Sequence, residues 1–270
     1  MMFLARRASF SASVVSSIFF AAAAWADRPM STDRPDATES PFTVEPGRYQ
    51  IEASAVSFTR ERHRPDHEPV RETEWNLAPV NLRMGVSPSA EVQLILDNYR
   101  NVEQVDLRTG ARERVTGWGD VTLRFKQNLW GNDGGDSGLA WMPWAKLPTA
   151  ADGLGNDHVE GGLIVPYARE LGGGWSLGLM TELDLLYEET RDTHEAVWLN
   201  TATVSRELGG AWGGFLELAW EVGMGRPAGT FNTGVTYTIN DDSQLDAGVF
   251  LGLTRAAPDI QAFVGWARRY

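Results

Sequence analysis

The stretch that decides the fold is 175–188, with the sequence WSLGLMTELDLLYE. Its alternate positions are apolar apart from one threonine, beginning and ending with an aromatic residue, and the positions between them include Glu182, Asp184 and Glu188. A period of two predicts a β-strand. An apolar face with aromatic ends, opposite an acidic face, is typical of a strand that crosses a membrane. A soluble sandwich would have to bury those carboxylates in its core.

The same period recurs along the rest of the chain. Further strands are expected at 49–55, 75–86, 92–97, 121–126, 138–147, 158–170, 196–206, 212–222, 232–239, 245–254 and 260–270. The total is about twelve, an even number, as in bacterial outer-membrane barrels. We therefore expect an all-β protein, a closed up-and-down barrel of antiparallel transmembrane strands.

Three prolines fall inside the expected strands, at Pro79, Pro143 and Pro166. Each removes a donor from the hydrogen-bond ladder of a sheet that has no free edge. The apolar phase changes at Pro79, so a β-bulge there would explain both the proline and the change of phase. The sequence offers no account of Pro143 and Pro166.

The connections between the expected strands alternate in length. Longer polar connections are expected at 60–69, 99–116, 148–157 and 189–195, and tight turns at 87–89, 172–174, 209–210 and 240–243. Outer-membrane barrels have long external loops and short periplasmic turns, so both termini should be periplasmic. Five aromatic residues then fall near the periplasmic rim, namely Tyr49, Trp175, Trp212, Tyr237 and Tyr270. A terminal strand that ends in an aromatic residue is expected to engage the barrel-assembly machinery, although Arg268 departs from the usual pattern.

The first residues predict export. Arg6 and Arg7 precede an apolar stretch at 8–24, and Ala24-Trp25-Ala26 offers a cleavage site. We expect a signal peptide at 1–26, rather than an uncleaved anchor, then an N-terminal periplasmic or lumenal segment at 27–46 and the barrel at 47–270. The net charge of −12 argues against a nucleic-acid partner. The chain has no cysteine, which excludes disulfides and thiolate metal sites.

Charged residues on the polar faces are the candidate lumen residues. The basic candidates are Arg83, Arg124 and Lys126, and the acidic candidates are Glu182, Asp184, Glu188, Glu217, Glu221 and Asp246. Opposed basic and acidic walls would set a transverse field that selects polar or zwitterionic solutes. Alternatively, the charges pair across a narrow interior and fill it. The sequence leaves both interpretations open.

The N-terminal segment, 27–46, is polar and rich in proline. It could enter the lumen as a plug or gate, with Asp33, Arg34, Asp36 and Glu39 pairing with wall charges. The alternative is a loose periplasmic lead. The motif resemblance described below favours the ordered arrangement.

No catalytic residue, cofactor or metal site is expected. Residues 135–138 (GDSG) imitate a serine-hydrolase motif, but they lie in a glycine-rich turn and none of the histidines at 63, 67, 158 and 194 faces a serine. The acidic stretch 152–160 does not have the spacing of a calcium loop. The arginine-rich stretch 60–64 could bind lipopolysaccharide phosphates, and a plain surface loop explains it equally well.

Several motifs carry a resemblance to one family. Residues 31–41 (STDRPDATESP), 44–52 (VEPGRYQIE), 117–126 (GWGDVTLRFK) and 147–155 (LPTAADGLG) resemble the outer-membrane barrels of the MetA pathway of phenol degradation, with alanine at a usual glycine in the last motif. The resemblance covers nearly the whole mature chain and implies an outer-membrane location and uptake of organic compounds. We therefore expect passage of small organic molecules, aromatic ones among them. A closed structural or surface-interaction barrel is the second hypothesis and an outer-membrane hydrolase the third.

Overall fold

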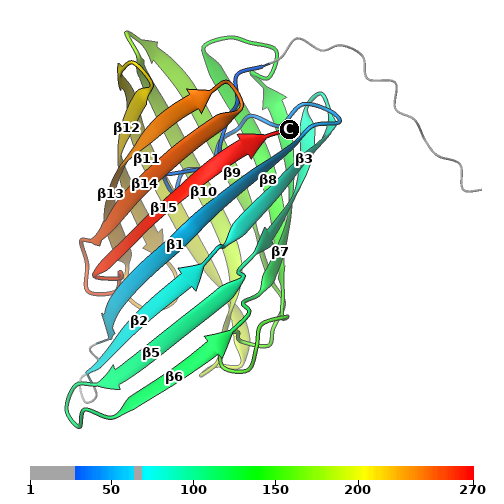
Figure 1. Cartoon of the computed structure of the whole chain (residues 1–270). Coiled ribbons are helices and arrows are strands. Elements are labelled where there is room, and N and C mark those ends of the chain that lie inside the picture. Colours follow the sequence, from blue (N-terminus) through cyan, green and yellow to red (C-terminus); the bar gives the residue numbers. More distant parts are fainter. Residues whose placement is uncertain (1–27, 64–68) are drawn as a thin grey trace, which may run out of the picture.

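The computed structural model describes residues 28–63 and 69–270, and within them every regular element is a β-strand. The strands are β1 (Tyr49–His63), β2 (Val70–Leu77), β3 (Val80–Ser87), β4 (Ala90–Leu96), β5 (Tyr99–Asp106), β6 (Arg112–Gly117), β7 (Val121–Trp130), β8 (Ser137–Leu147), β9 (Glu160–Gly172), β10 (Trp175–Glu188), β11 (Thr193–Gly209), β12 (Trp212–Val222), β13 (Ala228–Asn240), β14 (Ser243–Gly252) and β15 (Ile260–Arg269). They form one antiparallel sheet, which closes because β15 pairs with β1 (Figure 1). The signal peptide expected at 1–26 lies outside the described residues.

The barrel has twelve strands, as expected, because three of them are interrupted. β1 pairs with β3 over one half of its length and with β2 over the other half. In the same way β4 and β5 are the two parts of one interrupted strand, and β6 and β7 are the two parts of another. The strand predicted at 175–188 is β10 with the same bounds.

The loop predicted at 99–116 is wrong, since this stretch forms β5 and β6, which pair with each other. With β2 and the far half of β1 they extend the barrel wall beyond the other strands (Figure 1). Charged residues occupy both faces of β5 and β6, so no apolar stripe marked the strands. The two-residue period is visible only where one face is apolar.

The strand is interrupted at Pro79, where the sequence predicted a bulge, but the register shift lies on the neighbouring strand. Ala78 has a positive φ of 53°, and β1 shifts its register against β15 between Ser54 and Val56, while two residues on each strand separate the pairs Ala53↔Val80 and Val56↔Leu77. Ser54 N donates to Pro79 O at 3.1 Å, so the ladder resumes at once. The missing donor of the proline therefore falls where the wall already bends.

Pro143 and Pro166 also lie where ladders are incomplete. The pairing of β7 with β8 has a gap between Arg124↔Trp144 and Gln127↔Trp141, which spans Pro143. The pairing of β8 with β9 has a gap beside Pro166. Both prolines thus remove a donor that the local ladder does not use.

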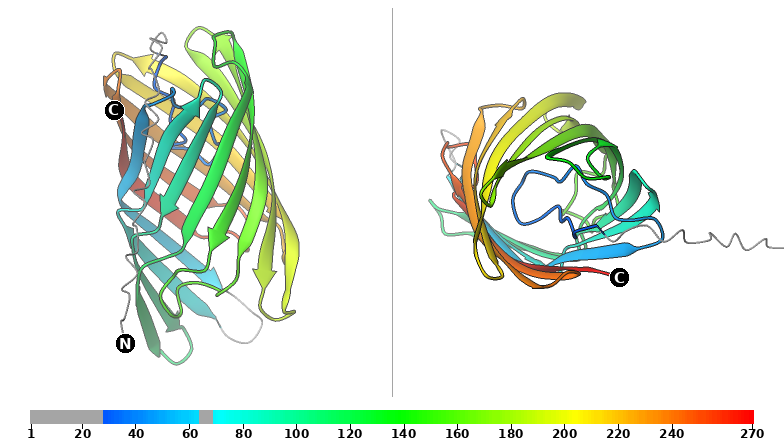
Figure 2. Two further views of the ribbon diagram at one scale, coloured as in Figure 1. Left: turned by 90° about the vertical axis from the view of Figure 1, so that its right-hand side faces the viewer. Right: turned by 90° about the horizontal axis from the view of Figure 1, so that it is seen from above.

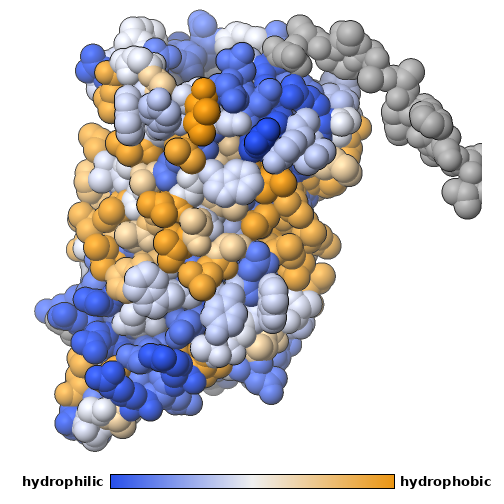
Figure 3. Space-filling view, in the orientation of Figure 1, coloured by the Kyte–Doolittle hydropathy of each residue, from blue (hydrophilic) through white to orange (hydrophobic). Residues whose placement is uncertain are grey.

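The outer surface carries an apolar belt between two hydrophilic ends (Figure 3). At the end with the tight turns, Tyr49 stacks on Tyr270 with ring centroids 4.9 Å apart, and Trp212 contacts Tyr237 at the same distance. Aromatic girdles of this kind mark the membrane–water interface of barrels. Within residues 28–63 and 69–270, the structure contains no helix with the length and apolar character needed to cross a membrane.

Candidate functional site

The described part of the N-terminal segment, residues 28–46, runs inside the barrel. Seen from above in Figure 2, it is the dark blue chain enclosed by the ring of strands. Thr38, Pro41, Thr43, Val44 and Glu45 of this segment are buried. Its contact with the sheet backbone is slight: Pro46 makes an isolated bridge with Gly85 on β3. Side-chain contacts therefore hold the segment in the lumen.

The basic wall binds the segment through Asp33. Arg83 on β3 and Lys126 on β7 are both fully buried, and Lys126 Nζ lies 2.6 Å from Asp33 Oδ1. Arg83 Nη1 lies 3.3 Å from Asp33 Oδ2 and 2.6 Å from Glu52 Oε1, while its Nε lies 2.9 Å from Glu91 Oε1. Burial alone would raise the pKa of the Asp33 carboxyl, but Arg83 and Lys126 lower it to about 2. Asp33 is thus held as a carboxylate between two cations.

A second contact on this side joins Glu39 to Arg124 of β7 through an ion pair. Burial raises the pKa of the Glu39 carboxyl to about 7, even though Arg124 opposes the shift. Two more of the predicted acids lie on β10, where Glu182 is half-buried and Asp184 is buried. Asp184 accepts a hydrogen bond from Trp144 Nε1 at 3.1 Å.

The acidic wall binds the segment through Arg34. Asp246 on β14 accepts two hydrogen bonds from its guanidinium, at 2.7 and 3.2 Å. Arg34 also donates to Ser54 Oγ at 2.9 Å and lies over the ring of Phe263. A paired, planar guanidinium–carboxylate contact fixes orientation as well as distance.

Glu217 on β12 binds the backbone of the segment. Its carboxylate accepts hydrogen bonds from Ala37 N at 2.9 Å and from Thr38 N at 2.8 Å. The hydroxyls of Thr38 and Thr201 on β11 lie 2.6 Å apart. Burial and the nearby Glu217 raise the pKa of the Asp36 carboxyl to about 7. The segment therefore links β3 and β7 on one wall to β11, β12 and β14 on the other.

Two of the acidic lumen candidates lie outside this cluster. Glu188, at the end of β10, accepts hydrogen bonds from Thr190 and Arg191 in the following turn. Glu221 is exposed near the end of β12. Both positions follow the polar phase of their strands but lie near the opposite rim from the segment.

Sequence reasoning missed several residues that bind the segment. Glu52 accepts a hydrogen bond from Asp33 N, Glu91 from Val44 N, and Gln93 donates to Asp33 Oδ2. Arg269 on β15 lies 2.9 Å from Glu45. Glu52, Glu91 and Gln93 are buried on the polar faces of their strands, and this shared phase with Arg83 was the available signal.

Beyond the segment, toward the long loops, the interior contains a polar chamber of about 280 Å³. It is lined by Ser57, Thr59, Glu74, Asn76, Asp97, Arg100 and Gln261. Arg100 binds Glu74 at 2.6 and 3.1 Å and also donates to Leu154 O at 2.7 Å. Within the described residues, the buried Oδ1 of Asn76 has no hydrogen-bond partner.

The loop 148–159 is tied to the chamber wall, because the lining residue Arg100 donates a hydrogen bond to Leu154 O. Asp120 accepts hydrogen bonds from Thr149 N at 2.8 Å and from Ala150 N at 2.9 Å, which hold the loop against the barrel. Lys146 pairs with Glu160 at 2.6 Å, so Glu160 is already neutralised by a lysine.

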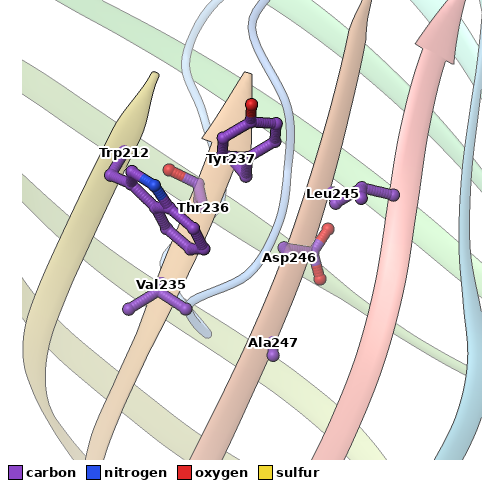
Figure 4. Close-up of a pocket in the computed structure, with 7 residues that line it drawn as sticks. All are labelled: Trp212, Val235, Thr236, Tyr237, Leu245, Asp246 and Ala247. Carbon is purple, nitrogen blue, oxygen red and sulfur yellow. The ribbon is translucent and has the colours of Figure 1, made fainter. Parts of the chain in front are cut away.

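A second hollow, of about 320 Å³, lies beside β12, β13 and β14 (Figure 4). Trp212, Val235, Tyr237 and Leu245 in its lining are exposed on the outer belt. Its apolar, outward-facing walls suit lipid chains rather than a solute in transit.

The serine of the GDSG turn begins β8, where Ser137 Oγ accepts a hydrogen bond from Trp130 Nε1. His158 and His194 instead lie near the opposite rim, beside Tyr187. His67 lies outside the described residues, as does the side chain of His63.

Comparison with known proteins identifies the class first. An outer membrane channel from Pseudomonas putida F1 shares the fold with a TM-score of 0.62 and 12% identity, covering 89% of this chain and 100% of that one. The NanC porin matches with a TM-score of 0.50 and 7% identity, covering 82% and 98%. The β domain of the Bordetella autotransporter BrkA matches with a TM-score of 0.50 and 15% identity, covering 84% of this chain and 100% of that one. The protein therefore has the fold of outer-membrane β-barrels.

The family follows from the sequence. Residues 32–270 match the family described as "Putative MetA-pathway of phenol degradation", and the chain belongs to it. No curated protein matches the chain.

Proposed function

We propose that this barrel lets small organic solutes, aromatic ones among them, cross the outer membrane, and that the N-terminal segment gates their passage. The observation that carries the proposal is the ion-paired attachment of the segment to opposite walls, through Asp33 on one side and Arg34 on the other. A segment held by side chains can leave without breaking the sheet. The outer membrane channel from Pseudomonas putida F1, which has the same fold, supports the proposal.

The wall charges support a gate rather than a permanently open pore. Arg83 and Lys126 on one wall, and Asp246 and Glu217 on the other, all bind the segment when it is docked. Its departure would leave basic and acidic walls facing each other across the lumen. Such an arrangement sets a transverse field and favours polar or zwitterionic solutes.

The chamber narrows the class of solute. Its acceptors outnumber its donors, because Arg100 is already bound to Glu74 and Leu154 O. Asp97 Oδ1 receives only a 3.3 Å hydrogen bond from Asn76 among the described contacts, and Asn76 Oδ1 receives none. A solute that presents hydroxyl or amino hydrogens would satisfy these acceptors, whereas a bare hydrocarbon would leave them unpaired.

The competing function is a closed structural barrel, which the dense ion pairing around Asp33 would also suit. We propose no catalytic step, cofactor or metal. For assembly, we propose that the machinery that inserts barrels binds β15 together with Tyr270, the residue that follows it and stacks on Tyr49.

The test is ion conductance and solute uptake by the mature protein in planar bilayers and liposomes. We expect the intact protein to open rarely, and a variant without residues 27–46 to conduct steadily. A matched control replaces the three charged residues of the exposed turn 189–192, Glu189, Arg191 and Asp192, with glutamine or asparagine and should conduct as the intact protein does. If the truncated barrel does not conduct, the closed structural barrel is favoured. Its folding is checked by heat-modifiable electrophoretic mobility.

A further inference from the structure

The outward face of the wall extension formed by β1, β2, β5 and β6 changes in character along the strands. Register places residues of these four strands side by side in rows. The aromatic row is Phe58, Trp75, Asn101 and Thr116; the inner arginine row is Arg60, Thr73, Glu103 and Arg114; the outer arginine row is Arg62, Arg71, Val105 and Arg112. Residues paired directly across an antiparallel ladder lie on one face, so all three rows share the outer surface.

The row between the two arginine rows faces the other way and is acidic. Glu61, Glu72, Gln104 and Glu113 form the row that alternates with the two arginine rows. The chamber residues Glu74 and Arg100 belong to the same inner face. In a chain of net charge −12, five arginines are therefore concentrated on one outward surface.

Four of the five arginines are exposed and Arg71 is half-buried, and among the described residues two acids, Asp259 and Glu103, lie within ion-pair distance of Arg62, Arg112 and Arg114. The exposed fractions of the Arg62, Arg112 and Arg114 side chains are 47%, 66% and 61%. Glu103 is shared by Arg112 at 3.7 Å and Arg114 at 2.7 Å, and Asp259 lies 3.5 Å from Arg62. Arg62 pairs directly with Arg71 across β1 and β2. Like charges directly opposite are unfavourable without a counter-anion.

The depth of these rows matches a lipid headgroup. Phe58 and Trp75 pack with ring centroids 4.8 Å apart, as rim aromatics do at a membrane interface. The inner arginine row lies about 7 Å further along the strands and the outer row about 14 Å further, at roughly 3.4 Å per residue. Figure 3 shows a hydrophilic surface at this end of the barrel, below the apolar belt.

We infer that the two arginine rows bind the phosphate groups of the glycolipid in the outer leaflet, the lipid A part of lipopolysaccharide. Guanidinium groups bind phosphate oxygens in pairs, and several arginines at one depth can hold a diphosphorylated headgroup. The lipid, rather than a free phosphate, is the occupant, because the arginine rows continue the lipid-facing aromatic row. A phosphate in transit through the lumen would instead meet the acidic inner face.

The test titrates the purified full barrel in detergent with diphosphoryl lipid A and follows binding by native mass spectrometry. The variant Arg62→Gln/Arg112→Gln is compared with Arg206→Gln/Arg268→Gln, which removes the same charge from arginines stacked on Trp175 and Tyr270 at the other rim. We expect about tenfold weaker binding for the first variant and unchanged binding for the second.

Two further arms identify the ligand. Monophosphoryl lipid A should bind more weakly than the diphosphoryl form, and millimolar inorganic phosphate should not displace the lipid. The inference is overturned if both variants weaken binding equally, if neither weakens it, if the number of phosphates has no effect, or if inorganic phosphate displaces lipid A completely.

Discussion

The two halves of the barrel interior are both polar, yet one is filled and the other is hollow. Near the tight turns, Arg83, Lys126, Asp246 and Glu217 bind the N-terminal segment, so their charges are buried in pairs. Near the long loops, Asp97 and Asn76 line a chamber of about 280 Å³ and keep unused acceptor capacity. The difference shows that wall polarity alone does not decide whether a lumen is open. The length of chain available to pair with the wall decides it.

The largest expected effect comes from removing a buried charge in the filled half. Arg83→Met leaves Asp33, Glu52 and Glu91 with one lysine between them. Breaking a buried network of this kind costs about 3–5 kcal/mol. We expect the segment to undock, measured as cleavage after Glu39 by endoproteinase Glu-C. Arg100→Met, in the hollow half, should leave that cleavage site protected, and equal cleavage in both variants would remove the distinction between the halves.

A smaller effect is expected from crowding the segment where it crosses the wall. A side chain at Gly85 would overlap the backbone of Val44 and Glu45, so Gly85→Ala should displace the segment at a cost of about 1–3 kcal/mol. The readout is the rate of the same cleavage. Gly214→Ala is the control, because its nearest contact is the flexible Leu208 side chain. Full protection of Glu39 in Gly85→Ala would show that the segment is not seated on β3.

The pH dependence of gating sharpens the comparison further. Asp36 and Glu39 have pKa values raised to about 7, so their docked state is most favoured when they are protonated. The contribution of these two protonated carboxyls to docking is complete below their ordinary pKa values near 4, and it is lost as pH rises through about 7. The Asp33 carboxylate, with its pKa lowered to about 2, keeps its contribution throughout this window.

Bilayer recordings should therefore show more frequent opening at pH 8 than at pH 5. Asp36→Asn should flatten the dependence, whereas Asp106→Asn, at the end of β5 where the carboxylate binds the backbone of an exposed turn, should leave it unchanged. An opening frequency that falls as pH rises would contradict the assignment of these two carboxyls.

The smallest expected effect concerns the hollow half. Asp97→Asn removes a charged acceptor from the chamber, and hydrogen bonds to charged groups contribute about 1.5–3 kcal/mol in full and less when water competes. We expect liposome uptake of catechol to fall a few-fold relative to its dimethyl ether. Glu103→Gln, on the outward face of β5, is the control. An equal fall in the uptake of both solutes would mean that Asp97 does not bind the hydroxyl groups of catechol.

The fold was predictable because lipid imposes a period of two wherever a strand crosses it. Residues 175–188 are the clearest case, and their predicted bounds are those of β10. The period fails at 99–116, where β5 and β6 extend into water and neither face has to be apolar.

The candidate site was less visible in the sequence, because it depends on long-range pairing. Arg34 and Asp246 are separated by 212 positions and meet only because β14 lies beside β15, which closes the barrel on β1. The polar phase predicted which wall residues face inward, but it could not tell which of them the segment reaches. Glu52 and Glu91 have the same phase as Arg83 and were missed for this reason.

The central claim is that the N-terminal segment is a removable plug, and a reversible lock tests it most directly. The chain has no cysteine, so Thr38→Cys/Thr201→Cys introduces the only thiols, at positions whose hydroxyls lie 2.6 Å apart. We predict that the oxidised protein stays closed in planar bilayers, and that a reductant restores openings in the same membrane. The single variants should not respond to the reductant. Equal conductance of the oxidised and reduced double variant, with the disulfide verified by mass spectrometry, would contradict the account.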